Sequence, residues 1–297
     1  MTRDEEIGIL VAQMREGDLD LGAPPAEARA GFDALVEAIP VEDSFTFSKG
    51  DLGGIPDLKV TGPGMRDSGA VLYLHGGGYV VGNAHGYRGL AARLGRAAGV
   101  VAHAIDYRLA PENPMPAAVD DAVAAYKALV ASGVDPSKIV IAGDSAGGGL
   151  TLATLVALRD AGVPLPAAAF LISPWADLAG EGASMKSKAE EDPSLTETAL
   201  HTCAGHYAGA DTRNPVASPI HADLSGLPPL LIQVGSAEIL YDDAIRVARA
   251  AGAAGTRVTL EVWPKMIHVW HVFAFLLSDG RDAIDGAGAF MRKAMEG

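Results

Sequence analysis

The chain has 297 residues, 49% of them hydrophobic, and a formal net charge of −14. That length and hydrophobic content suit one large globular domain, or a domain with a small lid, and exclude a disordered or fibrous chain. The negative charge repels phosphate backbones and anionic lipid surfaces, so we expect no nucleic-acid partner and no insertion into a membrane.

The cysteine count and the N-terminus narrow the class of protein further. Cys203 is the only cysteine, so neither an intramolecular disulfide nor a thiolate cluster for a metal can form. The first ten residues are acidic where a signal peptide would be basic, and no run of roughly 18 apolar residues occurs, even around 269–277. We therefore predict a cytoplasmic protein.

Short apolar runs alternate along the chain with segments of helical spacing. In residues 117–130, for example, Val119, Val123, Tyr126 and Val130 fall on one helical face. Because parallel strands need crossover connections, the alternation predicts an α/β fold with a mostly parallel sheet and helices on both faces. The predicted strands are Val71–Leu74, Val100–Ile105, Ile139–Ala142, Ala168–Ile172, Pro229–Val234 and Val258–Trp263.

Two stretches break this alternation and divide the chain. Residues 1–45 show no strand pattern, and residues 181–216 are polar and helix-prone. We predict that both contribute to a small helical cap, and that 46–180 and 217–297 form the two parts of the core. Within the first part, the segment 50–69 is rich in glycine and proline and is interpreted as a strand-and-turn approach to the sheet.

The sequence Gly-Asp-Ser-Ala-Gly at 143–147 matches the motif G-x-S-x-G. A predicted strand precedes it and a helix-prone run, 149–159, follows, so Ser145 is expected on a sharp strand-to-helix turn with its hydroxyl exposed. This context favours a nucleophilic serine over the alternative, a glycine-rich turn that happens to contain a serine. The helix N-terminus behind Ser145 also favours developing negative charge.

A second glycine-rich motif, His-Gly-Gly-Gly at 75–78, directly follows the strand that ends at Leu74. Glycines let backbone N–H groups point into a site with no side chain in the way, and two such donors stabilise a tetrahedral oxyanion. The alternative is a phosphate-binding loop, but no Gly-Lys-Ser/Thr ending follows it. We interpret 75–78 as an oxyanion loop.

A serine hydroxyl needs a base that takes its proton. In α/β folds with a G-x-S-x-G motif, the base follows the serine in the sequence, on a loop after a later strand. His268 lies on such a loop, five residues after Trp263, and is the best candidate. His271 is the runner-up, one helical turn further on, where a core or surface histidine is the ordinary explanation. The histidines show no ligand spacing such as H-x-x-x-H, so we predict no metal site.

Three carboxylates compete for the position that orients the histidine. Glu238 lies in the loop that follows the strand 229–234, whereas Asp242 and Asp243 begin a helix-prone stretch where acids commonly complement the helix dipole. We favour Glu238 and keep Asp242 as the alternative.

Together these motifs resemble those of bacterial esterases related to hormone-sensitive lipase, within the α/β hydrolases. Three further sequences carry the resemblance: Asp-Tyr-Arg-Leu-Ala-Pro-Glu at 106–112, Pro-Ala-Ala at 116–118 and Ser-Pro-Trp at 173–175. The resemblance implies an α/β-hydrolase fold with an N-terminal helical cap, and an oxyanion held by the backbone N–H groups of Gly76, Gly77 and Ala146. A homodimer also follows from the resemblance as a prediction.

The predicted function is that of a serine carboxylesterase with a Ser-His-Glu triad and no metal or organic cofactor. The resemblance implies short- to medium-chain acyl esters as small-molecule substrates, and it places Glu238 where aspartate is more usual. Tyr79, Trp175, Met185 and Val269 are candidates for the acyl pocket, although large apolar residues are more often plain core.

Two other functions compete with this prediction. The same site would act on amides, lactones or acetylated sugars, because fold and triad do not discriminate among acyl donors. The fold also serves small-molecule receptors that resemble this family but have lost the catalytic histidine. The presence of candidates for all three triad positions argues against a receptor.

Overall fold

The computed structural model describes residues 2–17 and 19–297. Within these residues the chain forms an eight-stranded sheet in the order β1-β2-β4-β3-β5-β6-β7-β8. The pairs β1/β2 and β2/β4 are antiparallel, and the other neighbouring pairs are parallel. The strands are β1 (Thr46–Leu52), β2 (Ile55–Thr61), β3 (Arg66–Leu74), β4 (Val100–Ile105), β5 (Ile139–Asp144), β6 (Ala168–Ile172), β7 (Leu230–Gly235) and β8 (Val258–Trp263).

The predicted fold class is confirmed, and the six predicted strands correspond to β3 to β8. β3 begins at Arg66 rather than at Val71, because its polar first residues pair with β4 across a shift in register between Arg66 and Ala70. The predicted strand-and-turn segment forms the antiparallel pair β1 and β2 at one edge of the sheet. The parallel part of the sheet therefore carries all the strands that lead into the candidate site.

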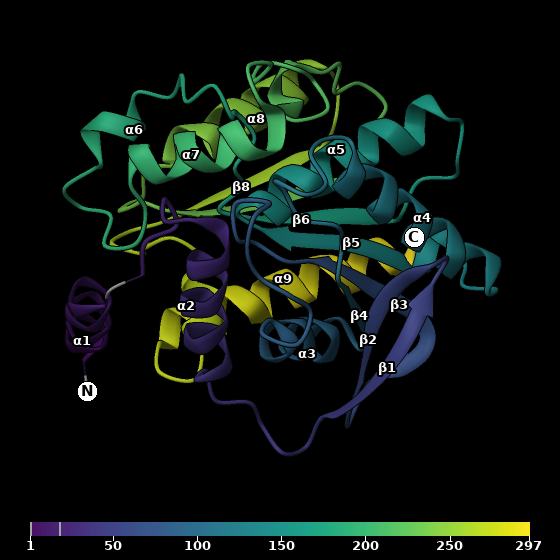
Figure 1. Ribbon diagram of the computed structural model, residues 1–297. Helices are drawn as coiled ribbons and strands as arrows, with labels where there is room; N and C mark the ends of the chain where they lie inside the picture. The colour runs from purple at the N-terminus through teal and green to yellow at the C-terminus, as the bar shows by residue number, and fades with distance from the viewer. Residues whose placement is uncertain (1, 18) are drawn as a thin grey trace.

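Helices cover both faces of the sheet (Figure 1). α3 and α9 pack together on one face, and α5 lies on the other with α4 and α8. α5 approaches the sheet closely, since a Cβ on Gly147 would stand only 2.0 Å from the carbonyl oxygen of Leu74. These helices are α3 (Arg88–Ala98), α4 (Ala117–Ala131), α5 (Ala146–Asp160), α8 (Tyr241–Ala253) and α9 (Ser278–Glu296).

Two segments that are distant in sequence lie side by side at one end of the molecule, where Figure 1 draws the N-terminal helices in purple. The guanidinium of Arg15 donates to the carbonyl oxygen of Glu190 at 2.8 Å, and the thiol of Cys203 lies 3.6 Å from the carbonyl oxygen of Leu21. Such contacts are what a cap assembled from both segments requires. The helices of the two segments are α1 (Arg3–Glu16), α2 (Pro25–Glu37), α6 (Ser184–Ser187) and α7 (Glu197–Ala208).

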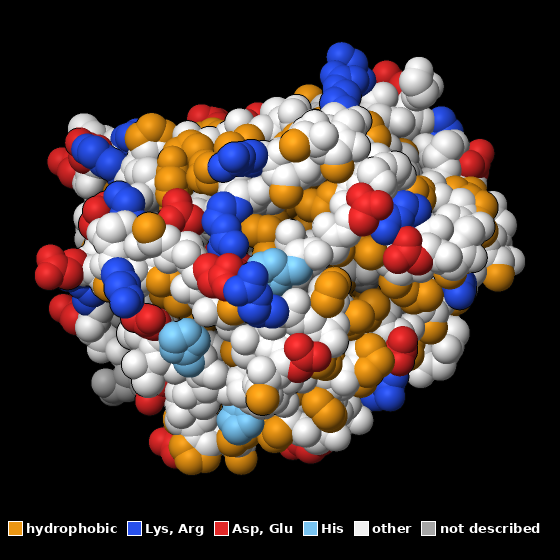
Figure 2. All heavy atoms as spheres, turned by 90° about the horizontal axis from the view of Figure 1, so that it is seen from above, with side chains coloured by type: hydrophobic (Ala, Val, Ile, Leu, Met, Phe, Trp, Pro, Cys, Tyr) orange, Lys and Arg blue, Asp and Glu red, His pale blue; other side chains and the backbone are white. Residues whose placement is uncertain are grey.

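The surface is mixed in character on the side seen in Figure 2, where acidic, basic and apolar side chains are interspersed. Large exposed apolar side chains lie on separate elements, with Ile9 on α1, Leu35 on α2 and Val262 on β8. Single apolar residues of this kind are ordinary on a protein surface. None of the helices among the described residues combines the length and the apolar character needed to cross a bilayer.

Candidate active site

Ser145 lies on the turn between β5 and α5, with φ of 53° and ψ of −121°, a conformation that few residues other than glycine adopt. Its N–H donates to the carbonyl oxygen of Ile172 at 2.8 Å, and its own carbonyl accepts from the N–H of Trp175 at 2.9 Å. The turn is also tightly packed at Gly143, where a Cβ would stand 2.3 Å from the carbonyl oxygen of Gly147. Backbone strain persists where the surroundings fix it, and it is frequent at functional sites.

His268 follows β8 on a loop and is bonded to Glu238. The ring Nδ1 lies 2.6 Å from Glu238 Oε2, so Nδ1–H donates and Nε2 is left to act as a base. The other carboxylate oxygen of Glu238 accepts from the hydroxyl of Ser173 at 2.8 Å and from the N–H of Gly235 at 2.6 Å. Glu238 is fully buried, so these three donors hold its carboxylate in one orientation.

The pKa of His268 is set by opposing effects. Burial alone lowers it, because the imidazolium loses its hydration, but the hydrogen bond and the charge of Glu238 raise it, with further contributions from Asp192 and Asp144. The net result is a pKa above the ordinary value for histidine. The carboxylate of Glu238 therefore stabilises the imidazolium that forms when His268 accepts a proton.

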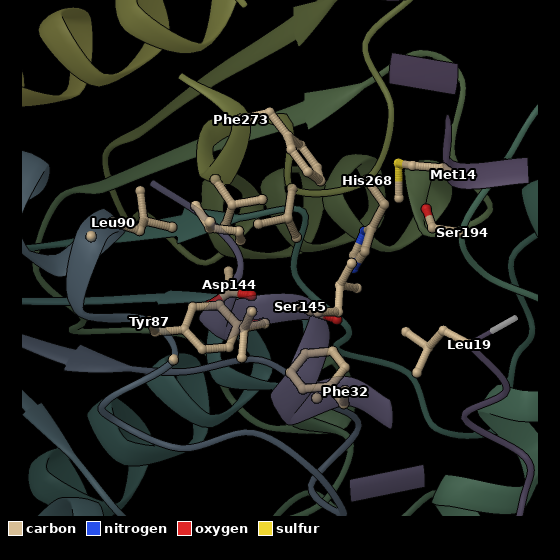
Figure 3. A pocket seen from close by; sticks show the side chains of 18 of the residues that line it. Met14, Leu19, Phe32, Tyr87, Leu90, Asp144, Ser145, Ser194, His268 and Phe273 are labelled. Atoms are coloured by element: carbon tan, nitrogen blue, oxygen red, sulfur yellow. The ribbon is translucent and has the colours of Figure 1, made fainter. Parts of the chain in front are cut away.

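Ser145 and His268 line one cavity, which encloses about 1040 Å³ of empty space including its open mouth. In Figure 3 the imidazole of His268 and the side chain of Ser145 lie next to each other at the centre of this cavity. The structure thus brings together the three predicted residues Ser145, His268 and Glu238, although they are separated by up to 123 positions in the sequence.

The two competing carboxylates bind other groups. Asp242 accepts a hydrogen bond from the N–H of Ser184 at 2.9 Å, next to α6. Asp243 accepts from the N–H groups of Ala176 and Asp177, each at 2.9 Å. Both carboxylates therefore fix the chain that follows β6, and neither is the partner of His268.

The runner-up histidine is a core residue. His271 is fully buried, and its Nε2 lies 2.7 Å from Oε1 of Gln233. Its ring packs edge-on against Phe170. Burial lowers the pKa of His271 to about 3, so this imidazole stays neutral in the core.

The glycine loop after β3 differs in one respect from the prediction. The N–H of Gly76 donates to Asp144 Oδ1 at 2.9 Å, so it points at a carboxylate and not into the cavity. Gly77 and Gly78 both line the cavity, with φ of 111° and 60°. Among the described residues, none accepts a hydrogen bond from the N–H of Gly77, Gly78 or Ala146. We therefore move one expected oxyanion donor from Gly76 to Gly78, while Gly77 and Ala146 stay predictions.

Asp144 binds the glycine loop, a contact that the sequence did not reveal. It is fully buried, the hydroxyl of Tyr73 donates to it, and a Cβ on Gly76 would stand 2.2 Å from its Oδ2. Burial raises the pKa of Asp144 to about 6, although the hydrogen bond from Tyr73 and the charge of His268 oppose this rise. Asp144 therefore anchors the glycine loop beside the serine. An acidic residue inside a motif that follows an apolar strand was the available signal.

Of the four residues predicted to line the acyl pocket, one lines the cavity and three are buried in the core. Val269 lines the cavity. Tyr79, Trp175 and Met185 are outside the cavity lining and are buried in the core, each at most 2% exposed. The ring of Tyr79 stacks on Tyr207 with centroids 3.9 Å apart, which turns it away from the site. For these three residues the ordinary explanation, plain core, replaces the predicted role.

Most of the cavity wall comes from segments for which the sequence offered no residue-level prediction. The described cap residues that contribute are apolar or small, and in Figure 3 the labelled ones surround Ser145 and His268. They are Met14, Leu19, Leu21, Phe32, Leu35, Val36, Ile39, Pro40, Val41, Ser194, Leu195 and Leu200.

One group of described residues has the spacing of a metal site but is already neutralised. Ligand atoms of Asp177, Glu181 and His221 lie within 4.8 Å of one another. The guanidinium of Arg246 donates to Asp177 at 2.5 Å and lies 3.4 Å from Glu181. A cation already balances these carboxylates, and the group belongs to the ion pairs that join α8 to the loop after β6.

Comparisons with known proteins show the fold and the family. A family described as having the alpha/beta hydrolase fold matches residues 71–272. An acetyl-hydrolase of Streptomyces hygroscopicus is 54% identical over 233 residues, covering 78% of each chain. The crystal structure of an esterase from the bacterial hormone-sensitive lipase family superposes with a TM-score of 0.94 at 43% identity, over 99% of this chain and 100% of that one. The crystal structure of EstE5 soaked with p-nitrophenyl butyrate matches with a TM-score of 0.94 at 44% identity, over 98% of this chain and 99% of that one.

Proposed function

The chain belongs to the esterases of the hormone-sensitive lipase family within the α/β hydrolases, and on that premise we propose that Ser145, His268 and Glu238 hydrolyse short- to medium-chain carboxylic esters. The observation that carries the proposal is the 2.6 Å bond from His268 Nδ1 to Glu238, which leaves Nε2 of a cavity-lining histidine beside a cavity-lining serine. The esterases among the relatives support the reaction type.

The first half of the reaction acylates the serine. His268 Nε2 accepts the proton of the Ser145 hydroxyl as its oxygen attacks the ester carbonyl carbon. Negative charge collects on the carbonyl oxygen, which faces the N–H groups of Gly77, Gly78 and Ala146 and the N-terminus of α5. The imidazolium of His268 then protonates the leaving alcohol, and the acyl group stays on the serine oxygen.

The second half returns the enzyme to its starting state. Water replaces the alcohol and gives a proton to His268 Nε2 as it attacks the acyl carbon. The acid leaves, and the serine oxygen regains its proton. Throughout, Glu238 holds the ring tautomer and balances the imidazolium without accepting the proton itself. The cycle is complete with side-chain and backbone groups of this chain.

The cap restricts the substrate by shape. Residues 1–45 and 181–216 supply the apolar wall opposite the serine, and such a wall selects acyl chains by length more than by polarity. The relative named as an acetyl-hydrolase and the EstE5 structure soaked with p-nitrophenyl butyrate support the short end of the range. A homodimer and a cytoplasmic location stay predictions.

Hydrolysis of p-nitrophenyl acetate, butyrate, octanoate and palmitate by the wild-type protein and by Ser145→Ala tests the proposal. We expect wild-type kcat/KM to fall as the chain lengthens towards palmitate, and Ser145→Ala to lose at least about 10³-fold in rate. Ser137→Ala is the matched control, because Ser137 is exposed at the opposite end of β5 from Ser145 and is expected to keep the wild-type rate.

Two results would contradict the proposal. If Ser145→Ala keeps the wild-type rate, the nucleophile is a different residue. If the wild-type protein is inert on all four esters, the site takes another acyl donor, and a panel of amides, lactones and acetylated sugars identifies which.

A further inference from the structure

The cavity wall contains one charged group that the mechanism does not use. Arg93 is the only lysine or arginine among the described residues that line the cavity. The other polar side chains there include Ser145, His268 and Asp144, which belong to the catalytic centre or anchor its glycine loop. Most of the remaining wall is apolar. Arg93 is therefore the one permanently charged cation among the described residues of a largely apolar wall.

Arg93 reaches the cavity from α3. It lies one helical turn after Gly89 and Leu90, which also line the cavity, so the three residues share one face of the helix. In Figure 3, Leu90 lies on the opposite side of Ser145 from Leu19, which places the α3 wall at the far side of the catalytic centre from the loop between α1 and α2.

Among the described residues, the guanidinium of Arg93 has one ion-pair partner, Glu42. Its Nη1 lies 3.2 Å from Oε1 of Glu42, and the same carboxylate is bonded by Arg96 at 2.5 and 3.0 Å. One carboxylate therefore serves two guanidinium groups, and Arg281 adds a third positive charge nearby. Guanidinium has five N–H donors in a planar fork that matches a carboxylate, so Arg93 has donors to spare.

The charges around Arg93 are positive in balance, because Arg93, Arg96 and Arg281 outnumber Glu42 and Asp285. The net charge of −14 repels anions at long range, but at physiological salt this repulsion is screened over about 8 Å. The side chain of Arg93 is 16% exposed, so its interactions are screened less than those of a surface arginine. Burial lowers the pKa of Arg93, and Glu42 opposes that change, yet guanidinium stays protonated in proteins.

We propose that Arg93 binds a carboxylate carried by the substrate, so that the site prefers esters with an anionic group remote from the scissile bond. The apolar wall takes the hydrocarbon that joins the ester to the carboxylate, and the guanidinium pairs with the charge at its end. The inference rests on the esterase function proposed above and names its substrate class. Neutral esters remain substrates, because they use the same catalytic centre without this contact.

Two substrate series test the inference, one for each half of the ester. Monoethyl esters of succinic, adipic, suberic and sebacic acid carry the carboxylate in the acyl half, and ethyl esters of the monocarboxylic acids of equal length are their neutral references. O-Acetyl derivatives of ω-hydroxy acids carry it in the alcohol half, with alkyl acetates as references. We expect a charged substrate to be preferred in kcat/KM at some length in at least one series, which also tells which half faces Arg93.

Variants of Arg93 test whether this residue causes the preference for esters that carry a carboxylate. Arg93→Met is expected to lower the ratio of charged to neutral kcat/KM by about tenfold, as for loss of a hydrogen bond to a charged group. Arg93→Lys keeps the charge and is expected to retain part of the preference. Arg96→Met is the matched control, since it loses a bond to the same Glu42 but lies outside the cavity lining.

The inference is overturned if the wild-type protein shows no preference at any length in either series, or if Arg93→Met and Arg93→Lys both leave the ratio unchanged. Its failure is distinct from failure of the esterase function. If only the inference about Arg93 fails, neutral ethyl esters are still hydrolysed and Ser145→Ala is inactive. If the proposed esterase function fails, Ser145→Ala retains activity or the wild type has none.

Discussion

The two sides of the cavity are built in different ways. At the strand ends, the backbone of Ser145 is fixed by hydrogen bonds to Ile172 and Trp175, and Glu238 holds His268 at 2.6 Å. The cap side presents apolar side chains from α1, α2 and α7, which meet across more than 150 positions of sequence. Hydrogen bonds also join α2 to the core, for example from the guanidinium of Arg29 to the carbonyl oxygens of Val80 and Ala110 at 2.8 Å. We therefore expect the strand-end side to set the rate of the reaction and the cap side to select the length of the acyl chain, so that substitutions on the two sides change different kinetic quantities.

The largest effect is expected from Glu238→Gln on the strand-end side. The amide cannot balance the imidazolium and can hold the wrong ring tautomer, so we expect kcat to fall by roughly 10³- to 10⁴-fold on esters of every chain length. Steady-state kinetics on acetate and octanoate esters measure this. Asp242→Asn is the control and should keep nearly the wild-type rate. An equal loss in both variants would contradict the assignment of Glu238 as the carboxylate that orients His268.

A pair of glycine substitutions compares the two sides directly. In Gly76→Ala the new Cβ would stand 2.2 Å from Asp144 Oδ2, so the glycine loop must shift and its oxyanion donors with it. We expect kcat to fall by about 10²-fold. Gly205→Ala, in the cap helix α7, meets no atom within 4 Å and should keep its activity and gain roughly 0.5–1 kcal/mol in the free energy of unfolding.

Kinetics and thermal unfolding of both glycine variants decide the comparison. If Gly76→Ala is fully active with an unchanged unfolding midpoint, the bond between Asp144 and the loop does not position the donors. If Gly205→Ala loses activity as well, the cap takes part in the chemistry and the separation of the two sides fails.

On the cap side, Met14→Trp adds bulk to the wall of the cavity. We expect kcat/KM for p-nitrophenyl octanoate to fall by about tenfold while that for the acetate is nearly unchanged, because one wrongly sized group in an apolar pocket costs about 1–3 kcal/mol. Ile9→Trp on the same helix is the control, since Ile9 is 41% exposed and lies outside the cavity lining. An equal loss on both esters would contradict a role limited to length selection.

The smallest expected effect is a shift in pH dependence. Only neutral His268 acts as a base, so kcat/KM rises with pH through the pKa of the free enzyme, which lies above the ordinary value of about 6.5. Glu238 favours the imidazolium, so Glu238→Gln removes a stabilising charge and should move this rise to lower pH. Profiles of kcat/KM for both proteins show it; an unchanged or higher midpoint in the variant would mean that other groups set the pKa of His268.

The strand-end side was predictable from sequence because each constraint there is local. The motif at 143–147 lies between a β-branched run and a helix-prone run, and His268 and Glu238 each follow a recognisable strand. The bond between Gly76 and Asp144 was not predictable, since it joins residues 68 positions apart and leaves no periodic signal. It is also the reason why we propose Gly78 rather than Gly76 as an oxyanion donor.

The predicted acyl pocket shows where sequence patterns fail. Tyr79 and Trp175 are large, apolar and close to the motifs. Both are nevertheless buried in the core, where the ring of Tyr79 stacks on Tyr207. Met14, Phe32 and Leu195 line the cavity although nothing local distinguishes them from other apolar residues. Which residues line the cavity depends on how α1, α2 and α7 pack over the core. No hydrophobic periodicity in a single sequence predicts that packing.

The most direct test of the account is to find the atom that becomes covalently modified. We predict that diethyl p-nitrophenyl phosphate inactivates the protein with one phosphoryl group per chain, and that mass spectrometry of the digested protein places this group on Ser145. His268→Ala should react far more slowly, because the serine then lacks its base. Full inactivation with the adduct on any other residue would contradict the account, as would unchanged activity in a protein modified at Ser145.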